Sequence, residues 1–156
     1  MLRIRPYEEA DRDAAIGLFL ELNRHEHTVC ADLRTDVGGA EFCVDDMVAG
    51  RAAGVEAVVA ELDGRVAGLM VWVVREDEAY IEEAVRRYGV VQDIVVSSAH
   101  RGHGVGKALL AEAERLTRAA GLSRLKLTVL EGNRAVEVYL SAGYRPHAHV
   151  MVKDLA

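Results

Sequence analysis

The clearest chemical pattern in the chain is three glycines at alternate positions, Gly102, Gly104 and Gly106, flanked by Arg101 and Lys107. Glycine takes positive φ angles and lets a ligand approach the main chain closely. The glycines follow an apolar, β-branched run and precede a helical pattern, so free N–H groups of a helix N-terminus should point into the loop. Such a turn binds anions, most often phosphate. Arg101 and Lys107 could instead be solvated charges, but positive charge at a helix N-terminus opposes the helix dipole, and an anionic ligand is the simpler explanation.

Two common phosphate-binding loops do not fit this spacing. The dinucleotide-binding pattern needs a third glycine where the chain has Lys107, and it belongs to the first βα turn of a domain, whereas this loop lies past the middle. The nucleotide P-loop needs glycine at Arg101 and serine or threonine at Ala108. The spacing therefore argues against both.

The pattern Arg101-x-x-Gly104-x-Gly106 after a strand resembles the coenzyme A pyrophosphate loop of the GCN5-related N-acetyltransferase family. A second segment, Asn133-x-Ala135-x-x-x-Tyr139-x-x-x-Gly143-Tyr144, is similar to that family's second acetyl-CoA motif. The resemblance covers essentially the whole chain, most closely residues 90–146. It implies an α/β fold with a mixed, mostly antiparallel sheet and a central parallel βαβ unit flanked by helices.

The resemblance also implies a binding site for acetyl-CoA. Loop N–H groups would hold the pyrophosphate, and the pantetheine arm would pair with the preceding strand, where a main-chain N–H polarises the thioester carbonyl. Asn133 would bind the pantetheine arm and Tyr139 would lie by the sulfur. The cofactor-binding residues implied in this way are Ile94, Val95, Val96, Arg101, Gly102, His103, Gly104, Val105, Gly106, Lys107, Asn133 and Tyr139.

Three side chains are candidates for acid–base chemistry. A phenol has a pKa of about 10, so Tyr139 could donate a proton to a leaving thiolate, whose thiol has a pKa of about 8.5. The attacking amine must lose a proton, and Asp93 or Glu83 could accept it directly or through water. Each has a structural alternative: Tyr139 could be a core tyrosine, Asp93 could take a structural hydrogen bond, and Glu83, with its neighbour Glu82, could be a solvated face. Asn133 could cap a helix as well as bind the ligand.

These residues need a scaffold, and hydrophobic periodicity predicts one. The strands expected are residues 2–5, 55–62, 66–74, 90–96, 125–130 and a last strand 144–152 interrupted at Pro146, with a hairpin at Asp63-Gly64. The helices expected are 11–24, 41–53, 104–120 and 135–142. Gly38-Gly39 marks a loop, and residues 75–87 read as a loop with some helix. The strand, helix and strand from 90 to 130 form a βαβ unit, so its strands should be parallel.

The composition of the 156 residues predicts one domain, 1–156. The net charge of −6 argues against nucleic acid as the main partner. No long apolar run or signal sequence is seen, so we expect a cytoplasmic protein without membrane partners. Cys30 and Cys43 are too few for a disulfide scaffold. His25, His27 and Cys30 lack a clear fourth ligand and a recognised zinc spacing, so no metal is expected.

The leading hypothesis is an acetyl-CoA-dependent N-acetyltransferase in which a primary amine, on a small molecule or a peptide, attacks directly in a ternary complex. The alternative is a non-catalytic acyl-CoA-binding or sensing domain of the same fold. A third reading keeps the enzyme but uses a longer acyl donor. The sequence does not identify the acceptor, and a homodimer is compatible with the resemblance.

Overall fold

The computed structural model describes all residues from Met1 to Ala156. Along the chain, the elements are β1 (Leu2–Pro6), α1 (Arg12–His27), α2 (Val37–Gly50), β2 (Glu56–Leu62), β3 (Arg65–Glu76), α3 (Glu83–Arg86), β4 (Arg87–Val96), α4 (Val105–Ala119), β5 (Leu125–Leu127) and α5 (Ala135–Ser141). Short 3-10 turns precede α1, follow α2 and follow β4. None of the helices combines the length and hydrophobicity that crossing a membrane requires.

The five strands form one sheet in the order β1-β2-β3-β4-β5. The first four pair antiparallel to their neighbours, and β4 pairs with β5 in parallel. The crossover between β4 and β5 contains α4, as the predicted βαβ unit requires. The mixed, mostly antiparallel sheet predicted from the sequence is therefore confirmed.

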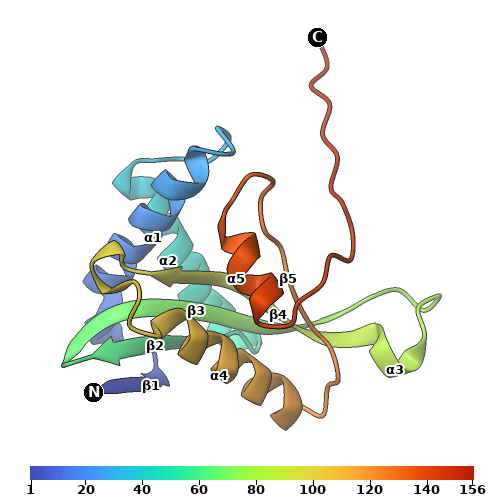
Figure 1. Ribbon diagram of the computed structural model, residues 1–156, viewed down its shortest axis with the longest axis horizontal. Coiled ribbons are helices and arrows are strands. Elements are labelled where there is room, and N and C mark those ends of the chain that lie inside the picture. Colours follow the sequence, from blue (N-terminus) through green and yellow to red (C-terminus); the bar gives the residue numbers. More distant parts are fainter.

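Two hydrophobic cores cover the two faces of the sheet (Figure 1). On one face, α1 and α2 pack their buried residues, including Phe19 and Met47, against Leu69 of β3. On the other face, Val105 and Leu109 of α4 pack against Trp72 and its neighbours. Because strand side chains alternate between faces, the central strands β2, β3 and β4 contribute to both cores. Because helices cover both faces of the sheet, the ends of the central strands are the positions from which functional groups can reach a ligand.

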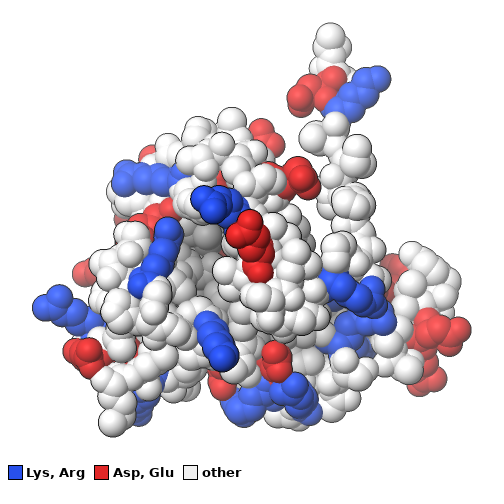
Figure 2. Space-filling model, in the orientation of Figure 1, with Lys and Arg blue, Asp and Glu red and all other residues white.

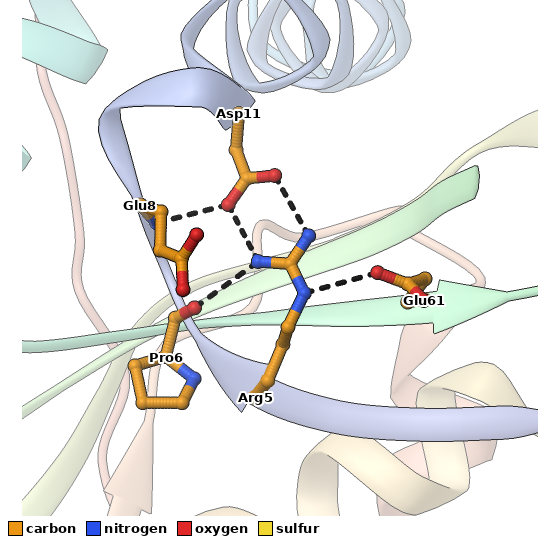
Figure 3. Close-up of polar contacts among 5 residues, drawn as sticks. All are labelled: Arg5, Pro6, Glu8, Asp11 and Glu61. Atoms are coloured by element: carbon orange, nitrogen blue, oxygen red, sulfur yellow. Dashed lines mark hydrogen bonds and ion pairs between the residues drawn. The ribbon is translucent and has the colours of Figure 1, made fainter. Parts of the chain in front are cut away.

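A buried ion pair joins β1 to the start of α1 (Figure 3). The guanidinium of Arg5 donates two hydrogen bonds to the carboxylate of Asp11, at 2.7 and 2.9 Å, and a third to Glu61 at 3.0 Å. Asp11 is only 5% exposed and also accepts a bond from the main-chain N–H of Glu8. The Arg5 guanidinium, together with the Glu8 bond, lowers the pKa of Asp11 despite its burial. The pair therefore fixes the entry into α1.

The second helix begins earlier than predicted. The expected helix 41–53 is α2, Val37–Gly50, so the prediction of a loop at Gly38-Gly39 is wrong. Glycine is a poor helix former, which is why the pair read as a loop. The structure shows why glycine stands at this position, since a Cβ on Gly39 would lie 2.9 Å from the Cβ of Arg34. Only glycine lets the first turn of α2 approach Arg34, which is held by its ion pair with Asp36.

The C-terminal segment differs most from prediction. The predicted strand 125–130 ends at Leu127, and the predicted last strand 144–152 is absent. Residues 145–156 form no helix or strand and are exposed throughout. In Figure 1 this tail runs away from the body of the molecule. A strand needs a hydrogen-bonding partner, and here the tail has none.

Candidate functional site

The glycine loop connects β4 to α4 and contains a row of main-chain N–H groups without hydrogen-bond partners in the chain. Gly102 and Gly104 have φ angles of 80° and 78°, the left-handed region that favours glycine, and Gly104 directly precedes the first residue of α4. No main-chain N–H from Arg101 to Lys107 donates a hydrogen bond within the chain. Residues 101–104 of the loop are exposed, and the donors lie at the positive end of a 15-residue helix. The loop therefore has the arrangement that binds phosphate oxygens.

The charged and ionisable side chains of the loop are all exposed. Arg101, His103 and Lys107 make no ion pair within the protein. The His103 ring contacts the carbonyl oxygen of Arg101 through Nδ1, at 3.0 Å. Arg101 and Lys107 are thus free to add positive charge to the row of N–H groups, although solvation alone would account for their exposure.

The strand that leads into the loop separates from its parallel neighbour. Pairing between β4 and β5 ends at Val91 and Leu127, whereas β4 continues on its β3 side to Val96. A bulge at Gln92 interrupts the β3–β4 register, since Val91 and Asp93 oppose consecutive residues of β3. Residues 94–96 of β4 therefore have no strand beside them on the β5 side. An extended ligand could pair with their main chain there.

A cavity of about 40 Å³ lies where β4 and β5 separate. The titratable side chains in its wall are Glu26 of α1, Asp93 of β4 and Tyr139 of α5. Its other lining residues are Leu22, Val91, Gln92, Ile94, Leu127 and Thr128. The fold therefore brings two predicted site residues, Asp93 and Tyr139, to one cavity, next to Ile94 of the predicted cofactor strand.

Burial and charge shift the acidities of all three side chains. Burial raises the pKa of Asp93 to about 6, and the nearby charge of Glu26 adds to the effect. Burial also raises the pKa of Glu26. The pKa of Tyr139 is raised first by burial and then by Glu26, so its phenol keeps its proton at neutral pH. The wall of the cavity thus holds a carboxyl group with a pKa of about 6 and a protonated phenol, two groups of the kind that acid–base catalysis uses.

The second motif is ordered around the start of α5. Asn133 is 7% exposed, and its side-chain oxygen accepts a hydrogen bond of 2.9 Å from the main-chain N–H of Ala135. Its amide nitrogen makes no hydrogen bond within the chain. Tyr139 packs edge-to-face against Tyr144, with ring centroids 6.0 Å apart. The capping contact is thus present, and it leaves the donor side of Asn133 available for a ligand.

Glu83 is not brought to the cavity. It lies in α3, before β4, with Glu82 just ahead of it, and both are exposed. The glycine loop follows the other end of β4, and Figure 1 shows α3 and that loop far apart. Asp93 is thus the one of the predicted carboxylates that lines the cavity.

Glu26 is a cavity residue that the sequence analysis did not identify. It lies on α1 four residues after Leu22, on the same helical face, and both line the cavity. This spacing was the only signal in the sequence, because a glutamate near the end of an amphipathic helix usually faces water. No group of three or more His, Cys, Asp or Glu side chains in the structure is arranged to hold a metal ion.

The mixed sheet, the parallel pair that separates after Val91 and the glycine loop before α4 are the arrangement expected of an α/β acetyltransferase. The sequence model of the Acetyltransferase (GNAT) family matches residues 6–144. The chain belongs to this family, as its two motifs predicted. A glucosamine 6-phosphate N-acetyltransferase from Trypanosoma brucei brucei is 33% identical over 70 residues. That match spans 45% of this chain and 46% of the relative, less than half the length of each.

Solved structures share the fold over nearly the whole chain. An acetyltransferase from Trypanosoma brucei superimposes with a TM-score of 0.71 at 24% identity, covering 99% of this chain and 100% of that one. A mutant Bacillus halodurans protein gives 0.83 at 17% identity, covering 99% of each chain. An aminoglycoside N-acetyltransferase in complex with CoA gives 0.74 at 16% identity, covering 99% of this chain and 95% of that one. At these identities the likeness establishes the fold.

Proposed function

We propose that this protein is an acetyl-CoA-dependent N-acetyltransferase that modifies a primary amine by direct attack in a ternary complex. The observation that carries the proposal is the cavity that Asp93 and Tyr139 share where β4 leaves β5. A binding or sensing domain needs the loop and the open strand, but it does not need a carboxyl group with a raised pKa and a protonated phenol in the wall of one cavity. The cavity therefore favours the enzyme over the sensor.

The loop and the strand fit the two ends of the cosubstrate. The unpaired N–H groups from Arg101 to Lys107 supply the donors that a pyrophosphate needs, and Arg101 and Lys107 add charge. Main-chain groups of residues 94–96 are open on the β5 side for the pantetheine arm. Asn133 supplies a further donor to that arm. When bound, acetyl-CoA supplies the acetyl group as a thioester, and the free thiol leaves.

In this proposal the side chains of the cavity manage the protons of the reaction. Asp93 takes the first proton from the acceptor ammonium, directly or through one water, which frees the amine lone pair. A main-chain N–H near Ile94–Val96 donates to the carbonyl oxygen on which charge develops. Tyr139 donates its phenolic proton to the departing sulfur, and the phenolate regains a proton, through water, from the attacking nitrogen, which must lose its second proton to become an amide. Glu26 acts through Asp93, because its negative charge helps to raise the pKa of that carboxyl group.

The charges of the cavity favour a cationic acceptor. Both charged side chains in its wall, Glu26 and Asp93, are carboxylates, and no lysine or arginine lines it. A polyamine, an aminoglycoside or a lysine side chain would be attracted to them. An amino sugar phosphate, the acceptor named for the trypanosomal relative, would place a negative charge near them. We therefore rank cationic amines first among the acceptors. For the acyl donor, we favour acetyl-CoA over a longer thioester.

The test is an assay of free thiol release by the purified protein with acetyl-CoA. The panel contains a polyamine, an aminoglycoside, a lysine peptide and glucosamine 6-phosphate. We expect amine-dependent thiol release, fastest with a cationic amine. Tight binding of acetyl-CoA without thiol release for any amine would support the sensing domain instead. Repeating the assay with butyryl-CoA tests the longer acyl donor.

A further inference from the structure

A glutamate of α1 contacts the turn from which the glycine loop begins. The carboxylate of Glu21 accepts a hydrogen bond of 2.9 Å from the main-chain N–H of Ser98, 77 residues further along the chain. Ser98 is the first residue of the 3-10 turn Ser98–His100, and the glycine loop follows that turn directly. In Figure 1 this turn, in yellow, lies beside α1. The contact therefore joins the first helix to the segment proposed to bind the pyrophosphate.

The bond from Ser98 to Glu21 is the N-terminal cap of the turn. Ser97, the residue before the turn, makes no capping hydrogen bond with its own side chain. The first N–H groups of a helical turn have no partner within it, so they must be satisfied from outside. A carboxylate is a strong acceptor for such a group, because its charge strengthens the bond. Glu21 thus supplies, from another element, the cap that the local sequence lacks.

Backbone contacts fix the other side of the same turn. The main-chain N–H of Ser97 donates to the carbonyl oxygen of Ala67 in β3, at 2.9 Å, and the N–H of His100 donates to the carbonyl oxygen of Ser97, also at 2.9 Å. The turn is therefore held by β3 on one side and by α1 on the other. Beyond it, the N–H groups of residues 101–107 have no partner in the chain. The direction in which these donors point depends on how the turn is held.

Glu21 has no other polar partner in the protein. Its side chain makes only the hydrogen bond to Ser98, and it forms no ion pair. It is partly buried although it is charged, and it lies three residues after the buried Leu18, at the border of the face that α1 packs on the sheet. The packing of α1 therefore sets the position of this carboxylate.

We propose that Glu21 is a positioning residue for the cosubstrate, because its cap holds the glycine loop in the conformation that receives the pyrophosphate. The inference rests on the proposed function, since it takes coenzyme A as the ligand of the loop. A loop that is ordered before binding loses less conformational entropy when the ligand binds, so loss of the cap lowers affinity. The negative charge of Glu21 acts in the opposite direction, because it repels a pyrophosphate. The hydrogen bond and the charge thus predict opposite results when Glu21 is replaced.

The first test measures the Kd for CoA by calorimetry, without an acceptor amine. Glu21→Ala removes the hydrogen bond, and the Kd should rise roughly tenfold. Glu21→Gln removes the charge but keeps an acceptor oxygen, so its Kd should remain close to that of the parent. The control Glu41→Ala removes an exposed glutamate of α2 and should leave the Kd unchanged. An unchanged or lower Kd in Glu21→Ala would overturn the proposal, as would an equal loss of affinity in Glu21→Gln.

A second test asks whether Glu21 acts through the N–H of Ser98. Ser98→Pro removes this donor, and proline suits the first position of a helical turn. Ser97 has a φ of −50° and a ψ of 135°, angles that a following proline permits. In the Ser98→Pro background, Glu21→Ala should leave the Kd for CoA unchanged, whereas in the Ser98→Ala background, which keeps the N–H, it should raise the Kd as in the parent. A rise of the same size in both backgrounds would contradict the proposal.

The unmodified protein separates this inference from the proposed function. If it does not bind CoA, both are refuted. If it binds CoA and Glu21→Ala binds equally well, only the role of Glu21 is refuted. If it binds CoA through a loop that depends on Glu21 but releases no thiol with any amine, the positioning role stands and the proposed enzyme does not.

Discussion

Glu26 of α1 and Asp93 of β4 lie in the wall of one cavity, and the charge of Glu26 contributes to raising the pKa of Asp93 to about 6. Burial is the larger cause. The two carboxylates come from opposite halves of the chain, and the packing of α1 on the sheet brings them together. Because of this relationship, the proposed role of Asp93 as the base can be tested through the pH dependence of activity.

We predict that kcat/KM falls below about pH 6, because Asp93 must be ionised to accept a proton. Glu26→Gln removes a negative charge, so the pKa of Asp93 should drop and the acidic limb should shift to lower pH. Glu21→Gln, on the same helix but outside the cavity, is the control and should leave the limb in place. The measurement is a pH profile of the rate with the cationic amine well below its KM, where the rate is proportional to kcat/KM. If the acidic limb of the profile stayed in place in the Glu26 variant, Glu26 would have no part in setting the pKa of Asp93.

Asp93→Asn separates a catalytic carboxylate from a structural one. A carboxyl group whose pKa is higher in the folded than in the unfolded state lowers the stability of the fold as pH rises from the unfolded-state value through the folded-state value. Ionised Asp93 therefore destabilises the fold at neutral pH. The variant should therefore unfold at a higher temperature at pH 7.5 while kcat falls by roughly 10²–10⁴. If Asp93 instead made a needed structural hydrogen bond, the same variant would unfold at a lower temperature. Thermal unfolding and thiol release, measured on the same preparation, give the unfolding temperature and kcat.

Tyr139→Phe should slow turnover and spare cosubstrate binding. The substitution keeps the ring that packs against Tyr144 and removes only the proton donor. We expect kcat to fall by roughly 10²-fold or more and the Kd for acetyl-CoA, measured by calorimetry, to stay within about twofold. Tyr144→Phe is the matched control, since its hydroxyl is buried without a partner and does not line the cavity. Lost binding in the Tyr139 variant would contradict its role as the acid.

The sequence predicted the parts of this site that depend on local pattern. The loop with glycines at 102, 104 and 106 can be predicted from neighbouring residues alone, and two of these glycines have positive φ angles in the structure. Glu26 was missed because its role depends on how α1 packs, which helical periodicity does not report. Gly39 was misread because glycine is a poor helix former, whereas the close approach of α2 to Arg34 at this position leaves no room for a Cβ. The pattern at 144–152 predicted a strand, but this segment pairs with no neighbouring strand in the structure, and a strand requires a partner as well as a pattern.

Gly104→Ala tests the loop against a matched glycine. Gly104 and Gly121 both have positive φ, 78° and 73°, and an added Cβ at either would meet open space. Alanine at each should cost about 1 kcal/mol of folding stability through backbone strain. Only Gly104→Ala should weaken acetyl-CoA binding, because only that site lies in the row of donors at the start of α4. Equal affinities in the two variants, measured by calorimetry, would refute the placement of the pyrophosphate.

The ion pair between Arg5 and Asp11 predicts an acid-sensitive fold. The lowered pKa of Asp11 means that its contribution to stability is present above the unfolded-state value of about 3.9 and is lost as pH falls through the lower folded-state pKa. Asp11→Asn leaves the Arg5 guanidinium with Glu61 as its only carboxylate and should cost about 3–5 kcal/mol at neutral pH. Urea unfolding measures this loss, and the control Asp45→Asn, at an exposed ion pair with Arg12, should leave the midpoint unchanged. Since Asp11 anchors the start of α1, its loss should also disturb the position of Glu26. An Asp11→Asn protein as stable as the parent would show that the pair is dispensable for docking α1.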